Sequence, residues 1–385
     1  MLKPEIQKTR LDMAYYLQDK MRSGYERYLD EQKLEWEGGL LKTYLIESDV
    51  VDKPRDAHNQ ILFYLKKQSE WFNYYVEELN EENFFALVAR SRVGRQEKFD
   101  IFYIDASDSR FWITYTIGHS TRTDHFIERL INRSVMLDNA WFPVQFLSGL
   151  AQTRGSFNGL GGRFSNSPFV REEEEQLKIS LKLWGNLAQD VFDAFRKSDR
   201  LRRMFSLSNI RLKRYLSGTD ESVTDDISYL GKITSMGQSF DSHLDLINKV
   251  YKEEYKSKIV ETIEKELAIG VDFHGDAAIL KGEPIFVVFN KPIQNLEAFT
   301  RMLFSGTSPF RLWGLQEVIK NDFARVYAVD LHLGRSLTFE VFPDAIRIFL
   351  PVGTCGNSVA RFFTLFQHHY DSSAELMGGK HDSLF

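Results

Sequence analysis

The segment "FRLWGLQEVIKNDFARVYAVDLHLGRSLTFEVFPDAIRIFL" (residues 310–350) decides the fold class of this protein. It contains short runs of β-branched and aromatic residues that are separated by turn-forming residues, which is the pattern of consecutive strands. A helix with a phenylalanine-rich face is expected directly after them, over residues 357–371. The expected strands cover residues 310–316, 323–331, 335–342 and 345–350.

The rest of the chain mixes strands with helices in the same way. Apolar residues recur every three or four positions in 3–37 and 239–270, and they predict two long amphipathic helices. We therefore expect an α+β fold with mixed or antiparallel sheets. The similar stretches "LKLWG" (181–185) and "FRLWG" (310–314) leave open a repeated α/β module. Further strands are expected at 84–90, 98–105, 110–118, 177–185, 209–216, 227–237, 271–280 and 284–290, and further helices at 57–79, 123–132, 186–205 and 294–304.

Composition shifts divide the chain into candidate domains. The stretch "QTRGSFNGLGGRFSNSPFV" (152–170) is rich in glycine and serine, so we expect a linker or loop over 151–170. An N-terminal α+β domain over 1–150 precedes it. A basic middle α/β segment over 171–270 follows it, and a C-terminal α+β domain over 271–385 completes the chain.

The overall composition limits the compartment and the class of protein. The 385 residues are 43% apolar and 27% charged, which is ordinary for a globular protein. A net charge of −5 argues against a general coat for nucleic acid, and a single cysteine cannot form an internal disulfide. No apolar run approaches the roughly 20 residues that cross a bilayer. We expect a cytoplasmic protein without a membrane segment.

The only cysteine lies in "VGTCGNSVAR" (352–361), between a predicted strand and a predicted helix. Cys355 and Arg361 have the Cys-x5-Arg spacing of phosphate-binding loops in cysteine phosphatases. In such a loop the thiolate attacks, while the arginine and the helix N-terminus bind the phosphate. The alternative is structural: Gly353 and Gly356 permit a turn, and Cys355 is a small buried residue.

Histidines and carboxylates suggest a second chemistry in the C-terminal part. In "VDFHGD" (271–276), Asp272, His274 and Asp276 alternate along one face of a predicted strand. In "VDLH" (329–332), His332 could join them if the two strands were neighbours. Such a set could hold zinc or manganese. The alternative is a polar strand face in water.

The strongest charge signal is "FRKSDRLRRMFSLSNIRLKRY" (195–215), with eight cations and only one carboxylate. Cations beside an aromatic ring suit a phosphate backbone and a stacked base. The alternative is a solvated surface that pairs with an acidic segment or subunit. The candidate anion-binding residues are Arg196, Lys197, Arg200, Arg202, Arg203, Arg211, Lys213, Arg214 and Tyr215.

The sequence favours a binding or scaffold protein that acts through contacts with a protein partner or with a second copy of itself. The first alternative is a nucleic-acid-associated protein that uses the basic segment 196–214. The second is a hydrolase that uses either Cys355 with Arg361 or a metal at Asp272, His274 and His332. The sequence identifies no cofactor and leaves open whether the protein is an enzyme.

Overall fold

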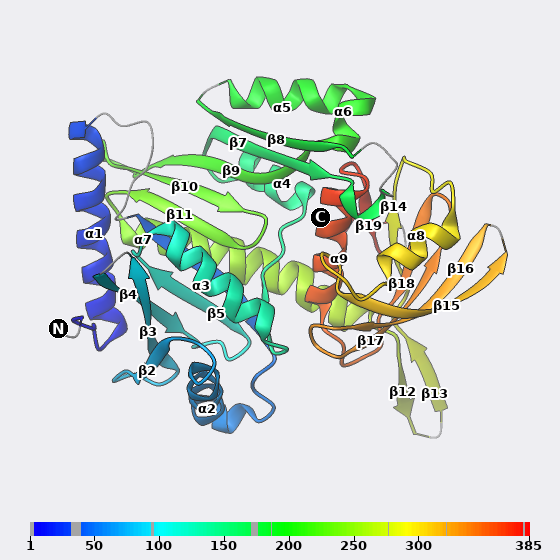
Figure 1. The fold of residues 1–385 in the computed structure, drawn as a ribbon, viewed down its shortest axis with the longest axis horizontal. Helices are drawn as coiled ribbons and strands as arrows, with labels where there is room; N and C mark the ends of the chain where they lie inside the picture. Colours follow the sequence, from blue (N-terminus) through cyan, green and yellow to red (C-terminus); the bar gives the residue numbers. More distant parts are fainter. Residues whose placement is uncertain are drawn as a thin grey trace. The chain divides into compact units, whose positions relative to one another are not determined.

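The computed structural model describes residues 4–31, 40–93, 96–170, 176–185, 187–275, 277–320, 322–379 and 382–385. These residues form two compact units, and each is treated by itself below. The first is drawn from residues 1–140, 154–156 and 212–251, and the second from residues 141–153, 157–211 and 252–385 (Figure 1). Both combine helices with antiparallel sheets, which confirms the predicted α+β class.

The first unit is built on a sheet with the strand order β2-β3-β4-β5-β1-β11-β10, in which β6 also pairs with β1. Its elements are α1 (Arg10–Glu31), β1 (Leu41–Ser48), η1 (Pro54–Asp56), α2 (Ala57–Ser69), β2 (Tyr74–Glu78), β3 (Phe84–Val93), β4 (Gln96–Asp105), β5 (Phe111–Thr116), α3 (Ser120–Arg133), β6 (Leu137–Asn139), β10 (Ser222–Ser228), β11 (Lys232–Gly237) and α7 (Phe240–Ile247).

Both faces of this sheet are covered. On one face, Ile61 and Leu65 of α2 and Ile127 of α3 pack against Phe102 and Trp112 of the sheet. On the other face, Phe240 of α7 meets Tyr115 edge to face, and α1 lies along β11. Burial on both faces explains why β1 is buried along its whole length.

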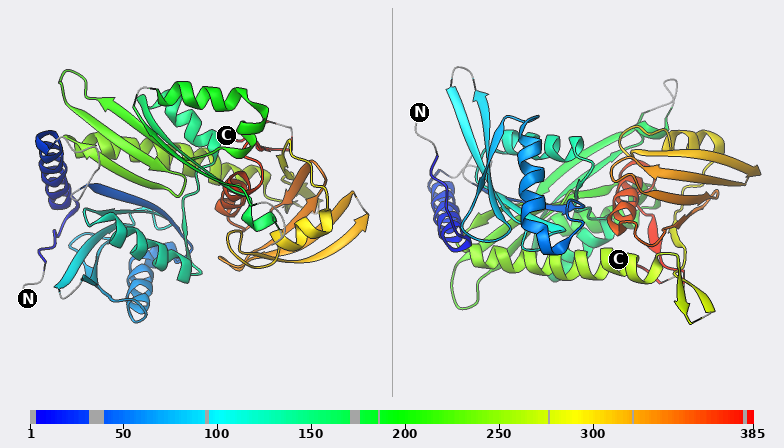
Figure 2. Two further views of the ribbon diagram at one scale, coloured as in Figure 1. Left: turned by 45° about the horizontal axis from the view of Figure 1, so that its top comes forward. Right: turned by 90° about the horizontal axis from the view of Figure 1, so that it is seen from below.

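The second unit contains a six-stranded sheet with the order β15-β16-β17-β18-β14-β19 and a separate β12-β13 hairpin. Its elements are α4 (Val144–Thr153), η2 (Ser167–Phe169), β8 (Lys178–Trp184), α5 (Ala188–Lys197), α6 (Asp199–Met204), η4 (Ile263–Leu267), β12 (Gly270–His274), β13 (Ala277–Lys281), β14 (Ile285–Val288), α8 (Leu296–Leu303), β15 (Leu312–Lys320), β16 (Phe323–Asp330), β17 (Ser336–Val341), β18 (Ala345–Phe349), α9 (Gly356–His369) and β19 (Glu375–Met377). Figure 2 shows the hairpin extending away from the six-stranded sheet.

Three elements contain residues of both units. The first is β7 (Ser156–Ser165), of which only Ser156 belongs to the first unit. The second is β9 (Ser206–Tyr215), which changes unit after Arg211. The third is η3 (Asn248–Val260), a π-helical stretch that follows α7 and changes unit after Tyr251.

The core of the second unit is aromatic. Phe299 of α8 stacks on Phe169 with ring centroids 4.9 Å apart, and Tyr370 meets Phe299 edge to face. On β16, Val326 and Ala328 are buried, while the residues that alternate with them are half-buried or exposed. The alternation shows that one face of the six-stranded sheet is packed and the other is open to solvent.

Several predicted boundaries move, each for a local reason. The helix expected over 3–37 begins only at Arg10, because Thr9 and Asp12 exchange hydrogen bonds that cap it there. The helix expected over 186–205 breaks at Ser198, whose side chain accepts a hydrogen bond from Leu201 N and caps α6. The helix expected over 57–79 ends at Ser69, because strand β2 follows it. The strand expected over 271–280 is divided by the turn between β12 and β13.

The glycine-rich stretch 151–170 is not a linker, because it forms the end of α4, strand β7 and η2. Its glycines leave room for neighbouring side chains. A Cβ on Gly159 would lie 2.3 Å from Trp184 Cε3, and one on Gly161 would lie 1.8 Å from Asn209 Oδ1. The glycines of β7 are therefore required by close packing on the sheet and not by flexibility.

Candidate functional site

The structure places Cys355 between β18 and α9, as predicted, and it occupies the N-cap position of the helix directly after a turn in which Gly353 has φ +85°. Gly356 is the first residue of the helix, and its backbone N–H donates a hydrogen bond to Glu264 Oε1 at 2.7 Å. A carboxylate of the chain itself therefore lies where a phosphate would bind at this helix N-terminus.

Arg361 is also held internally. Its guanidinium forms an ion pair with Asp330, and only 4% of Arg361 and 0% of Asp330 are exposed. Ser358 Oγ donates to the other carboxylate oxygen at 2.7 Å, and His332 N–H donates to the first at 2.8 Å. Burial alone raises the pKa of Asp330, but the Arg361 charge and these hydrogen bonds outweigh it and lower that pKa. The phosphatase hypothesis stays a prediction, and it requires Arg361 to leave this buried pair.

The residues of the predicted metal set are distributed over separate elements. Asp272 on β12 forms an ion pair with Lys281 on β13 at 2.8 Å. His332 follows β16 in the six-stranded sheet, where it is buried. Among the described strands β12 pairs with β13 and not with β16, so the two strands are not the neighbours that the metal hypothesis needs. His274 ends β12, and Asp276 lies outside the described residues. Within the described part of the chain, no group of three metal-ligating side chains is present.

The residues of the predicted basic segment differ in exposure and belong to both units. Four of its cations, Arg196, Lys197, Arg200 and Arg202, are exposed on α5 and α6. Arg203 is half-buried, and its Nε–H donates to the Asp199 carbonyl. Lys213 lies over the Tyr215 ring, 5.0 Å from its centroid, in the first unit.

Arg214 is a structural residue and not a surface cation. It donates two hydrogen bonds to Asp225 Oδ2 and one to the Ser242 carbonyl. Asp225 also accepts from His243 Nδ1–H at 3.1 Å and from Ser235 Oγ at 2.5 Å. His243, Asp225 and Ser235 all have 0% exposure. Sequence reasoning missed this network because its members lie on four different elements, β9, β10, β11 and α7, which only the fold brings together.

This set of serine, histidine and aspartate does not have the geometry of a catalytic triad. In a triad the serine and the aspartate bind different nitrogens of the imidazole. Here Ser235 and Asp225 both contact Nδ1, and Nε2 lies 2.8 Å from Thr43 Oγ1. With all three side chains buried, the network connects β1, β10, β11 and α7 instead of facing a substrate.

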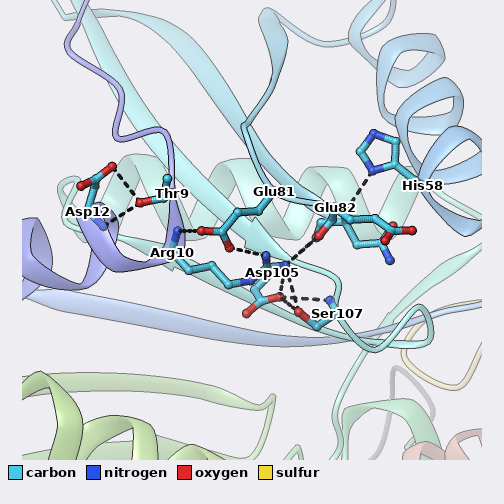
Figure 3. Close-up of polar contacts among 9 residues, drawn as sticks. Thr9, Arg10, Asp12, His58, Glu81, Glu82, Asp105 and Ser107 are labelled. Carbon is cyan, nitrogen blue, oxygen red and sulfur yellow. Dashed lines mark hydrogen bonds and ion pairs between the residues drawn. The ribbon is translucent and has the colours of Figure 1, made fainter.

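A second polar cluster fixes the start of α1 (Figure 3). Arg10 donates to Glu81 Oε2 at 2.6 Å and to Asp105 Oδ1 at 3.0 Å. It also donates to the carbonyl of Glu82, and its own amide donates to Glu81. The loops that follow β2 and β4 are thereby joined to the helix N-terminus. Since Arg10 pairs with carboxylates and carbonyls of the chain itself, the cluster has a structural role.

Lys42 is a cation buried in the middle of the sheet, with 1% exposure. Its ammonium donates to the Leu40 and Gly118 carbonyls at 3.0 and 2.7 Å. Burial, and then the charge of nearby Lys232, lower the pKa of Lys42 to about 8.

The lowered pKa of Lys42 predicts a pH dependence of stability. Between about pH 8 and the unfolded value of about 10.4, the unfolded chain binds more protons than the folded chain. Stability should therefore rise with pH in this window relative to Lys42→Met, in which the titrating group is absent. Urea unfolding of both proteins at the two ends of the window measures this, with the exposed Lys66→Met as control. Parallel pH dependences of wild type and Lys42→Met would contradict it.

One surface of the second unit combines aromatic and basic groups, and we call it the aromatic–basic face. Trp184 pairs with Gly159 in the register of β7 and β8, and Lys182 pairs with Gly161. Paired residues share a sheet face, as do alternate residues of one strand. Arg211 of β9 lies over the Trp184 ring, 3.7 Å from its centroid. The face consists of Arg163, Lys178, Lys182, Trp184 and Arg211.

A second surface is the solvent side of the six-stranded sheet, which we call the outer face. Trp313, Leu315 and Tyr327 are 53%, 66% and 50% exposed, and Leu315 pairs directly with Tyr327. Beside them runs a row of charged residues in register across β15, β16, β17 and β18. The row consists of Glu317, Arg325, Glu340 and Arg347.

These features define an α+β protein with two exposed sheet faces, and among its described residues none of the helices is long and apolar enough for a membrane span. The chain belongs to the MJECL33-like protein family, whose model matches residues 2–385. It is similar to the uncharacterized protein MJECL33 of Methanocaldococcus jannaschii, with 28% identity over 409 residues that cover 95% of this chain and 93% of that protein.

Proposed function

We propose that this chain is a protein-binding, scaffold-type protein whose docking surface is the outer face. The observation that carries the proposal is the exposure of Trp313, Leu315 and Tyr327 together on a sheet that is packed on its other side. Large aromatic and aliphatic side chains in the centre with charged residues at the rim are the composition of protein interfaces. Tryptophan and tyrosine are also the residues that contribute most binding energy in such interfaces.

The charged row favours a second copy of the chain as the partner. In strand order the row reads Glu317, Arg325, Glu340, Arg347, so its signs alternate. When a row of this kind is reversed, every position carries the opposite sign. A two-fold axis that lies in the interface, perpendicular to the row, would therefore place each charge against an opposite one. Self-complementarity of this kind is what a symmetric dimer requires.

Internal pairing keeps this row in place before any partner binds. Arg325 Nη2–H and Arg347 Nη1–H each donate to the Glu340 carboxylate at 2.8 Å. Glu340 is 6% exposed, and Arg347 also lies over the Phe286 ring, 5.2 Å from its centroid. A preorganised row loses little side-chain entropy when it meets its counterpart.

The proposal predicts a dimer that is lost when the apolar centre is removed. Light scattering after size exclusion should give twice 44.9 kDa for the wild type. Trp313→Ala combined with Leu315→Ser should weaken the dimer about 100-fold or more, because both are large exposed apolar side chains that the contact would bury. Since both are exposed in the single chain, the thermal midpoint of a dilute sample should change little.

Trp71→Ala is the matched control, because Trp71 is 72% exposed in the first unit and should leave the dimer intact. Glu317→Lys tests the orientation, since it disrupts the alternating row and should weaken the dimer while keeping the apolar centre. A wild-type chain that remains a 44.9 kDa monomer at high concentration would refute a second copy as the partner.

A further inference from the structure

We propose that the aromatic–basic face binds single-stranded nucleic acid. This activity lies on a different surface from the proposed dimer contact and does not depend on it. The inference rests on three observations: an exposed aromatic platform, three exposed cations that form no ion pair with a carboxylate of the described residues, and a strand whose glycines let neighbouring side chains lie flat on it.

The platform is the pair of Trp184 and Arg211. The indole is 40% exposed at the end of β8, and the guanidinium lies over it at 3.7 Å. Gly159 makes this arrangement possible, because any Cβ there would collide with the indole. Unpaired bases stack on aromatic rings and on arginine planes, so both groups offer a surface to a base.

Within strands β7, β8 and β9 the charge has one sign. Strands β7, β8 and β9 contain six lysines and arginines and no aspartate or glutamate. Arg163, Lys178 and Lys182 are exposed, and no carboxylate of the described residues forms an ion pair with them. These cations are available to phosphates, whereas Arg214 on the same strand β9 is used internally by Asp225.

The shape of the face favours single strands over duplexes. Gly159 and Gly161 carry no side chains, so the side chains of Trp184 and Asn209 lie directly on β7 and the face stays low between the cations of its neighbours. A flat sheet face cannot enter a groove, whereas unstacked bases can lie on it. An acidic peptide would satisfy the cations but would leave the stacking platform unused. A single strand satisfies both.

The test is fluorescence anisotropy with a labelled oligouridylate of about 15 nucleotides, a length that matches common single-strand sites. Wild-type protein should bind it, and the logarithm of the affinity should fall with the logarithm of salt concentration with a slope of about −2 for three phosphate contacts. Trp184→Ala should weaken binding about ten-fold or more through lost stacking. Lys178→Ala with Lys182→Ala should reduce the steepness of the slope by about 1.4.

The controls separate this face from other exposed groups. Trp71→Ala and Lys66→Ala with Lys67→Ala remove exposed residues of the same types in the first unit and should leave affinity unchanged. Loss of binding with Arg202→Ala and Arg203→Ala but not with Trp184→Ala would assign the site to α6 and overturn the proposal. Equal binding of the matching duplex, or equal competition by polyglutamate, would also overturn it, since neither offers an unpaired base.

Discussion

Replacing Asp225 by alanine is expected to lower the free energy of unfolding by about 3–5 kcal/mol, because it leaves buried cationic and polar partners without their acceptor. Asp225 has no solvent exposure, and it accepts hydrogen bonds from Arg214, His243 and Ser235. The partners come from β9, β11 and α7, so the loss should affect several elements at once. Thermal and urea unfolding measure the effect.

Hydrogen exchange can locate the change, since the amides of β10, β11 and α7 should lose protection first. Asp220→Ala is the matched control, because Asp220 is exposed in the loop before β10 and should alter stability by no more than about 0.5 kcal/mol. Equal stabilities of the Asp225 and Asp220 variants would show that the buried network contributes nothing.

The lowered pKa of Asp225 also predicts in which direction the stability of the protein changes with pH. Burial by itself raises the pKa of Asp225, but the hydrogen bond from His243 and the charge of Arg214 outweigh it, so the folded pKa is lowered. A carboxylate with a lowered folded pKa stabilises the protein above its unfolded pKa of about 3.9 and loses this effect as the pH falls through the folded value. The stability gap between wild type and Asp225→Asn should therefore narrow below about pH 4.

The second large effect is expected at Asp330, which pairs with Arg361 of α9. Asp330→Ala should cost about 3–5 kcal/mol, since it leaves Arg361 charged and buried with 4% exposure. Ser358 Oγ and His332 N–H would also lose their acceptor. Urea unfolding of the whole chain measures this loss in the free energy of unfolding.

Charge repair distinguishes an unpaired charge from a general packing defect. Asp330→Ala with Arg361→Met removes both charges and should be more stable than Asp330→Ala alone, because a buried pair replaced by apolar groups is often tolerated. Glu297→Ala is the surface control: its ion pair with Arg301 is largely exposed, so about 0.5 kcal/mol is the expected limit. A double variant no more stable than the single one would refute the charge argument.

Regular hydrophobic patterns were sufficient to predict much of the fold. The alternation in β16, β17 and β18 and the phenylalanine face of α9 are local signals, and the structure has these elements close to their expected bounds. The strands expected at 98–105 and 110–118 are confirmed as β4 and β5, which pair with each other antiparallel. Such patterns can be read from sequence because they repeat within a few residues.

Strand β1 shows what local patterns cannot predict. Its sequence, "LKTYLIES", contains a lysine, a threonine and a glutamate, yet all eight residues are buried. Each polar group depends on a distant partner: Lys42 on the Gly118 carbonyl, Thr43 on His243, and Glu47 on Arg110. A buried polar strand is stable only when these partners are present, and no feature within the strand itself identifies them.

The same distinction between local sequence patterns and contacts with distant segments applies to the candidate surfaces. The sequence by itself determined the α+β class, the basic middle segment and the two similar stretches that contain Trp184 and Trp313. Only the tertiary structure decided which of those groups remain available to a ligand. Arg214 and Arg361 bind buried carboxylates of the chain, whereas Lys182 and Trp313 face solvent. The reason is physical: residue type fixes the charge and shape of a side chain, but contacts between distant segments determine whether it is already paired.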